Sequence, residues 1–244
     1  MPMKFNIILF DSITSTNDYA KENFKHLKHK TIIIAKEQTK GKGRFSRNWY
    51  SPKEEALYTS IVIKKNLIAN DLPFINLIAS LSILKTIKNL SPIYPILKYP
   101  NDVYINTKKI AGILIETIFK VNKLEGIIIG IGVNINNTNF PPELSNKATS
   151  ILIECGKHID LSIFLNELLR IIFQYLDKKI DKDSIIEEWT KNSPTLFNKQ
   201  ILLILDGKIM KAITSGLVSN GYLRIRTDDG KYLELNTTDF FFPE

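Results

Sequence analysis

Apolar residues along this chain fall into short β-branched runs and into longer stretches with helical spacing. Strands are predicted where apolar residues run together or alternate, at 4–10, 31–35, 57–64, 97–105 and 125–133. Helices are predicted where an aspartate precedes an amphipathic stretch, at 71–90 and 160–175, and a shorter helix is predicted at 184–190. Strands mixed with packing helices favour an α+β domain built on a mixed sheet.

The pattern changes after the segment Asn192 to Thr195. Short strands follow from Gln200 onward, separated by the turn signals Asp206-Gly207, Asn220-Gly221 and Asp229-Gly230. Such closely spaced hairpins predict a small antiparallel β-barrel. We therefore expect a large domain at 1–195 and a small β-barrel domain at 196–244.

Composition excludes several classes of protein. The net charge of +8 favours acidic partners such as nucleotides, acidic proteins or nucleic acid, without choosing between them. Cys155 is the only cysteine, and the three histidines lack an acidic or cysteine-rich setting, so neither a disulfide nor a zinc site is expected. No apolar run approaches a membrane span and no secretory segment opens the chain, so a cytoplasmic protein without a membrane partner is expected.

The segment from Gln38 to Trp49 places two glycines and four cations between two predicted strands. Gly41 and Gly43 let the backbone approach a ligand closely, and the cations suit a phosphate or a carboxylate. A Walker loop needs Ser or Thr after Gly-Lys and then a helix, and a dinucleotide fingerprint needs a third glycine, so neither motif fits. The segment predicts either an anion-binding loop, in which Trp49 can stack on a planar group, or a solvated basic hairpin loop.

Polar groups also gather before a further short helix, which is predicted to run through Lys21. Ser15 with Asp18 approximates a capping box, while Thr16 and Asn17 lie where a helix offers free N–H donors to a ligand. Gln38, at the end of a strand, carries an amide that can both donate and accept hydrogen bonds.

Two later segments combine turns with glycines in strands. Lys-Tyr-Pro-Asn-Asp at 98–102 is followed by Lys-Ile-Ala-Gly-Ile-Leu at 109–114, which predicts a strand, a turn and a hairpin. Gly-Ile-Gly-Val-Asn at 130–134 ends a further strand. Isolated glycines in strands mark bulges or a close approach of another group to the backbone.

Together these segments resemble the biotin protein ligases. Gly-Lys-Gly-Arg-Phe-Ser-Arg-Asn-Trp is similar to the family's glycine-arginine loop. Ser-Thr-Asn at 15–17 and the segments at 98–114 and 130–134 match further motifs of the family, in the same order along the chain. The resemblance implies a mixed-sheet catalytic domain of the class II synthetase type followed by an SH3-like barrel. It also implies a monofunctional form without the DNA-binding domain of some relatives, and so no DNA partner.

The activity implied by this resemblance is ATP-dependent biotin protein ligation. Biotin and ATP would give biotinyl-5′-adenylate and pyrophosphate, with Mg²⁺ on the phosphates, and biotin would pass to one lysine of a biotin carboxyl carrier protein. The implied catalytic residues are Lys109, rather than Lys108, and Arg44. The implied biotin-binding residues are Ser15, Thr16, Asn17, Gln38, Gly41, Lys42, Gly43, Arg44, Lys109, Gly112 and Gly130. The implied adenylate-binding residues are Arg44, Arg47, Trp49, Asn101 and Asn134, and no metal ligand is assigned.

Four residues depart from the family's pattern. Lys42 stands where arginine is usual, Ser46 where glycine is usual, Tyr99 where tryptophan is usual and Ile110 where leucine is usual. The first replaces a planar fork by a point charge, and the second adds a Cβ atom to the loop. The strand at 110–119 is expected at a sheet edge, where the family places the carrier protein and, in some members, the second subunit of a homodimer.

Two other functions compete with this interpretation. A lipoate ligase or octanoyl transferase shares the fold and also joins a carboxylic acid to a carrier lysine, but such enzymes lack this glycine-arginine loop. A nucleic-acid-binding module would use the positive charge and the β-barrel. It would leave the segments at 98–114 and 130–134 without an explanation.

Overall fold

A computed structural model describes residues 5–53, 55–64, 69–121, 123–205, 208–235 and 240–241. The large N-terminal part contains the strands β1 (Asn6–Phe10), β2 (Thr31–Ala35), β3 (Ala56–Ile63), β4 (Ile96–Lys98), β5 (Asp102–Ile105), β6 (Lys108–Lys120) and β7 (Lys123–Asn134). Its helices are α1 (Thr16–Glu22), the short turns η1 (Arg44–Ser46) and η2 (Ala69–Asp71), α2 (Leu72–Leu90), α3 (Ile151–Cys155), α4 (Leu161–Leu176) and α5 (Lys182–Lys191). The C-terminal part contains β8 (Phe197–Leu205), β9 (Lys208–Leu217), β10 (Leu223–Thr227), β11 (Tyr232–Leu235) and β12 (Phe240–Phe241).

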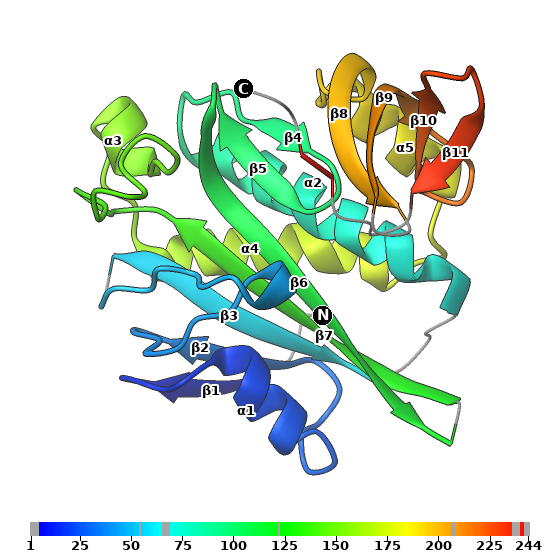
Figure 1. Cartoon of the computed structure of the whole chain (residues 1–244). Coiled ribbons are helices and arrows are strands. Elements are labelled where there is room, and N and C mark those ends of the chain that lie inside the picture. Colours follow the sequence, from blue (N-terminus) through cyan, green and yellow to red (C-terminus); the bar gives the residue numbers. More distant parts are fainter. Residues whose placement is uncertain are drawn as a thin grey trace.

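The seven N-terminal strands form one mixed sheet in the order β1-β2-β3-β7-β6-β5-β4. Only the pairing of β1 with β2 is parallel, and the other pairs are antiparallel. Helix α1 lies on one face of the sheet, and α2 and α4 lie on the other (Figure 1). The mixed α+β sheet predicted from the sequence is confirmed.

Alternation along β3 explains how one strand serves both layers. Leu57, Ile61 and Ile63 belong to the main core that contains α2 and α4, whereas Val62 packs in a smaller core with Phe24 of the α1 segment. Neighbouring side chains of a strand point to opposite faces, so a strand with apolar residues at consecutive positions is buried on both sides. The unbroken apolar run predicted the strand but did not identify the helix on each face.

The ends of α2 and α4 agree with the predictions, whereas the cap of α2 and the start of α5 do not. Asp160 accepts backbone hydrogen bonds from Ser162 and Ile163, so its carboxylate caps α4 as expected. Asp71 precedes α2 but makes no side-chain cap, and its carboxylate instead contacts the Lys182 ammonium at 2.8 Å. The helix predicted at 184–190 begins earlier, because Asp181 caps it.

The C-terminal strands form a separate antiparallel sheet in the order β11-β10-β9-β8-β12. The small C-terminal β domain is thus confirmed, although no pairing closes it into a barrel among the described residues. The turns at Asn220-Gly221 and Asp229-Gly230 are present, with both glycines at positive φ. The turn signal at 206–207 lies outside the described residues, and the boundary between 195 and 196 stays a prediction.

Strand β6 lies inside the sheet at its start and at an edge further on. It pairs with β5 only from Lys108 to Gly112, whereas it pairs with β7 along nearly its whole length. Ile113 exchanges hydrogen bonds with Asn101 on the β5 side. Because residues two apart in a strand point their N–H and C=O groups the same way, those of Ile115 also face the β5 side. In the described part of the chain no strand pairs with β6 on that side beyond this point.

Candidate active site

Glycines on β6 and β7 form the floor of a cavity on the α1 face of the sheet. The register places Gly112 beside Gly132, and Leu114 beside Gly130 and then Ser60 of β3. A Cβ atom on Gly130 would lie 2.3 Å from Asn17 Oδ1, and one on Gly132 would lie 2.5 Å from Trp49 Nε1. These glycines are required because polar and aromatic side chains rest directly on the strand backbone.

The loop between β2 and β3 folds across this floor. The Trp49 N–H donates to the Gly41 carbonyl at 2.9 Å, and the Gly43 N–H donates to the Arg47 carbonyl at 2.7 Å. Between them, Phe45 and Ser46 have φ values of 55° and 58°, in the left-handed region that costs a non-glycine residue about 1–2 kcal/mol. The departure at Ser46 therefore falls where the backbone favours glycine.

One end of the cavity is lined by amide and hydroxyl groups. Gln38 Oε1 accepts from the Thr16 N–H at 2.9 Å and from the Thr16 hydroxyl at 3.2 Å, while Gln38 Nε2 donates to Ser51 Oγ at 3.1 Å. The Ser15 Oγ caps α1 by accepting from the Asp18 N–H. This end can offer both donors and acceptors to a small polar ring.

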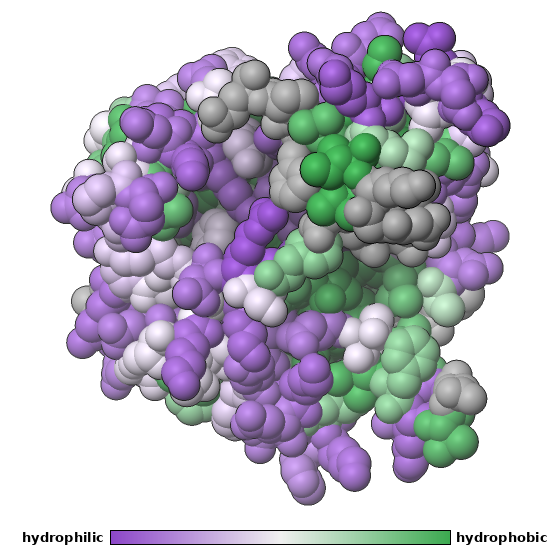
Figure 2. All heavy atoms as spheres, in the orientation of Figure 1, coloured by the Kyte–Doolittle hydropathy of each residue, from purple (hydrophilic) through white to green (hydrophobic). Residues whose placement is uncertain are grey.

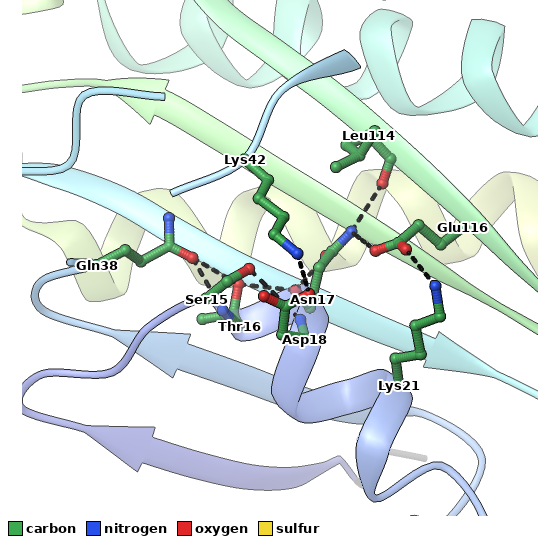
Figure 3. Close-up of polar contacts among 10 residues, drawn as sticks. Ser15, Thr16, Asn17, Asp18, Lys21, Gln38, Lys42, Leu114 and Glu116 are labelled. Carbon is green, nitrogen blue, oxygen red and sulfur yellow. Dashed lines mark hydrogen bonds and ion pairs between the residues drawn. The ribbon is translucent and has the colours of Figure 1, made fainter. Parts of the chain in front are cut away.

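Asn17 connects that end of the cavity to the neighbouring strands (Figure 3). Its amide oxygen lies 2.6 Å from the Ser60 hydroxyl, and its amide nitrogen donates to Glu116 Oε2 at 3.0 Å and to the Leu114 carbonyl at 3.3 Å. Glu116 also forms an ion pair with Lys21 at 3.1 Å. Three of the four hydrogen-bonding positions around the Asn17 amide are therefore occupied by groups of β3 and β6.

The loop contacts both sides of the cavity. Lys42 Nζ lies 2.6 Å from Asp18 Oδ1 at the start of α1, and this carboxylate raises the pKa of Lys42 (Figure 3). On the other side, Arg44 Nη1 donates to Asn101 Oδ1 at 3.1 Å, and Asn101 Nδ2 donates to the Ile113 carbonyl at 2.7 Å. The loop thus spans the cavity between α1 and the turn that leads into β5.

The opposite end of the cavity is cationic. Lys109 Nζ lies 2.6 Å from Asp102 Oδ1, a charge contact without hydrogen-bond geometry, and 5.3 Å from the centre of the Trp49 ring. Lys98 and Tyr104 lie beside them, and burial lowers the pKa of Lys98 and raises the pKa of Tyr104 to about 12. Among the described lining residues, the cations Lys42, Arg44, Arg47, Lys98, Lys109 and Lys147 face a single carboxylate, Asp102.

The cavity has a volume of about 480 Å³ and brings together nearly all residues that the sequence singled out. Figure 2 shows hydrophilic side chains over α1 and the neighbouring strands, and a hydrophobic area where β6 faces the C-terminal sheet. Gly41 does not line the cavity, because it packs against Ser51 and the Trp49 backbone. Asn134 lines the cavity, but its amide donates to the Thr149 carbonyl at 3.0 Å.

Several residues of the site were not predicted from the sequence. Ser60 and Glu116 lie within apolar strands. Their only signal in the sequence is that each is a polar residue inside such a strand. Asp102 belongs to the Pro-Asn-Asp turn and was assigned no role, although it is the carboxylate beside Lys109. Lys98 lies in the same segment.

Taken together, the fold and the cavity define a site for a ligand with a small polar ring at one end and an anionic group at the other. The chain belongs to the Biotin/lipoate A/B protein ligase family, whose sequence model matches residues 9–134, just over half of its length.

Individual relatives agree with this assignment. The chain is 32% identical over 167 residues to the bifunctional ligase/repressor BirA of Bacillus subtilis, covering 67% of this chain and 51% of that protein. It is 28% identical over 173 residues to the biotin–[acetyl-CoA-carboxylase] ligase of Mycobacterium tuberculosis, covering 68% and 57%. The chain thus matches about half the length of these relatives.

A solved structure extends the likeness to the whole chain. The biotin protein ligase of Aquifex aeolicus in complex with biotin and ATP superposes with a TM-score of 0.83 and 29% identity, covering 97% of both chains. The C-terminal sheet is therefore part of the shared architecture.

Two features are absent from the described residues. No group of three or more His, Cys, Asp or Glu side chains is arranged to hold a metal ion there. Nor does that part of the chain contain a helix long and apolar enough to cross a membrane.

Proposed function

We propose that this protein is an ATP-dependent biotin protein ligase, which activates biotin as biotinyl-5′-adenylate and transfers it to a lysine of a biotin carboxyl carrier protein. The observation that carries the proposal is the pairing, in one cavity, of the Thr16–Gln38 polar end with the Lys109–Arg44 cationic end. Family membership and the biotin and ATP bound by the Aquifex relative support it.

In the first step, a biotin carboxylate oxygen attacks the α-phosphorus of ATP. The bond from that phosphorus to the bridging oxygen breaks, and pyrophosphate leaves. Two anions must meet, and negative charge grows on the phosphoryl oxygens, so fixed cations lower the barrier. Lys109 and Arg44 would supply these charges, and Trp49 would pack near the adenine.

Magnesium belongs to this proposal as part of the ATP substrate. Mg²⁺ is usually held by one or two carboxylates together with substrate phosphates, rather than by a cage of protein ligands. Asp102, the one carboxylate among the described lining residues, suits that arrangement, and the ion would neutralise phosphate charge. In this proposal the Lys109 ammonium bridges the biotin carboxylate and the α-phosphate.

In the second step, the carrier lysine attacks the acyl carbon of the adenylate. The bond from this carbon to the phosphate oxygen breaks, AMP leaves, and the amine loses a proton. We propose that the carrier docks along β6 beyond Ile115, since a second hollow of about 290 Å³ lies there and shares Arg44, Ile113 and Leu114 with the main cavity. Edge pairing with a second copy, and a cytoplasmic location, remain predictions.

The nearest competing function is ligation of lipoate or octanoate. Those acids need an apolar channel, whereas the far end of this cavity presents the Thr16 and Gln38 groups. A site built to hydrogen-bond its substrate rejects an analogue without those groups strongly, because its buried polar atoms would stay unpaired.

The test is incubation of the purified protein with radiolabelled biotin, ATP, Mg²⁺ and a biotin carboxyl carrier domain. An acid-stable label should appear on the carrier, and replacing its acceptor lysine by arginine should abolish it. Labelled octanoate in place of biotin is the matched control. Efficient octanoate transfer without biotin transfer would refute the proposal in favour of the competing function.

A further inference from the structure

Glu116 lies outside the cavity, yet it controls a group inside it. Its side chain points to the α1 face of the sheet, two residues beyond Leu114 on β6. From there one carboxylate oxygen accepts from the Asn17 amide at 3.0 Å, and the other contacts Lys21 at 3.1 Å (Figure 3). Glu116 is half-buried, with 22% of its side chain exposed.

This contact, together with the longer hydrogen bond to the Leu114 carbonyl at 3.3 Å, decides which way the Asn17 amide is turned. Asn17 is 4% exposed, so each of its polar atoms needs a partner within the protein. An ionised carboxylate can only accept hydrogen bonds, so the NH₂ group must face Glu116 and the amide oxygen must face Ser60. Ser60 alone could not impose this orientation, because a hydroxyl can donate or accept.

The orientation of Asn17 is passed on to the polar end of the cavity. The Ser60 hydroxyl has one hydrogen and two acceptors, Asn17 Oδ1 at 2.6 Å and Thr16 Oγ1 at 2.8 Å. Thr16 in turn lies within hydrogen-bond distance of Gln38. A turned Asn17 amide would redirect the Ser60 hydrogen and change which groups Thr16 and Gln38 offer to a ligand.

We propose that Glu116 is a positioning residue for recognition of the biotin ureido group, acting through the amide of Asn17 and the hydroxyl of Ser60. This inference rests on the proposed biotin ligase activity. It assigns Glu116 no contact with the substrate and no part in the adenylation chemistry. Its loss should therefore weaken biotin recognition while leaving the use of ATP intact.

The experiment measures adenylate formation with biotin and ATP varied in turn. The unaltered protein is measured first, and failure to use biotin at all would refute the proposed function itself. Given activity, Glu116→Ala should raise KM for biotin about tenfold, since a charge-assisted hydrogen bond is lost, with KM for ATP changed less than about twofold. The preference for biotin over octanoate should fall by a similar factor, because octanoate has no ureido group.

Three further variants separate positioning from a general structural role. Lys21→Ala removes the other partner of Glu116 and should leave KM for biotin unchanged. Glu116→Gln keeps an acceptor oxygen and should raise that KM only about threefold, which also carries the test if the alanine variant does not fold. Adding Glu116→Ala to Asn17→Ala should cause no further rise in KM for biotin. Equal rises in both KM values, or no rise for biotin, would overturn the inference.

Discussion

Replacing Lys109 by alanine removes an ammonium group from the cationic end of the cavity. The group contacts Asp102 at 2.6 Å and lies over the Trp49 ring, with 28% of its side chain exposed. Lys108, the adjacent residue, instead donates to the Ser145 carbonyl at the exposed surface. Lys108→Ala is therefore a matched control that removes the same charge one residue away.

The size of the effect follows from the setting of Lys109. A partly buried charge 4 Å from a phosphoryl oxygen is worth about 4 kcal/mol at an effective dielectric constant of about 20. Measured losses of a single oxyanion donor are about 2.7–4 kcal/mol. The ground state already feels part of this attraction, and Asp102 offsets some of the charge. We therefore expect adenylation to slow by about 100-fold or more, at the lower end of that range.

The assay is single-turnover formation of biotinyl-adenylate from labelled ATP, with thermal unfolding followed in parallel. Lys109→Ala should lose rate at saturating biotin and ATP while unfolding near the temperature of the unaltered protein. Lys108→Ala should retain its rate. A normal rate in Lys109→Ala together with an inactive Lys108→Ala would show that the wrong lysine carries the chemistry.

Four other substitutions test separate parts of the site. Ile115→Pro removes only an N–H that faces the open edge of β6, so the rate of carrier labelling should fall much more than the rate of adenylation. Equal losses in both assays would mean that the edge is not a docking strand. Gly130→Ala places a methyl group against Asn17 and should raise KM for biotin about tenfold. Gly132→Ala places a methyl group against the Trp49 indole and should raise KM for ATP instead. The reverse pattern would contradict the assignment of biotin to the polar end and ATP to the cationic end. Ser46→Gly removes strain at φ 58° and should slow trypsin cleavage of the ligand-free loop, and faster cleavage would argue against a strained closed form.

Much of the fold could be predicted because its signals are local. The β-branched runs and the stripe of α2 each identify an element without any distant contact. Asp71 shows the limit, because its position before a helix predicted a cap, whereas an ion pair with Lys182 takes its carboxylate. Sequence spacing cannot tell which of two available partners a side chain will choose.

The candidate site was predictable wherever a residue type is unusual for its element. Glycines within β6 and β7 and paired glycines in a basic loop stand out, and Gly43, Gly112, Gly130 and Gly132 line the cavity with Lys109 and Arg44. Ser60 and Glu116 could not be recognised in this way, because isolated polar residues in a strand usually face solvent. Their importance depends on a register across three strands, which is a tertiary property.

We expect the form of the glycine-arginine loop that spans the cavity to be only marginally stable without a ligand. Phe45 and Ser46 together cost about 2–4 kcal/mol for their left-handed backbone, since neither is glycine. Against this, the exposed ion pair of Lys42 with Asp18 contributes about 0–1 kcal/mol, and the hydrogen bond from Arg44 to Asn101 about 1.5–3 kcal/mol. These terms nearly cancel, so a bound phosphate beside Arg44 would decide whether the loop stays closed. Coupling loop closure to the adenylate in this way would also exclude water from the mixed anhydride until the carrier lysine arrives.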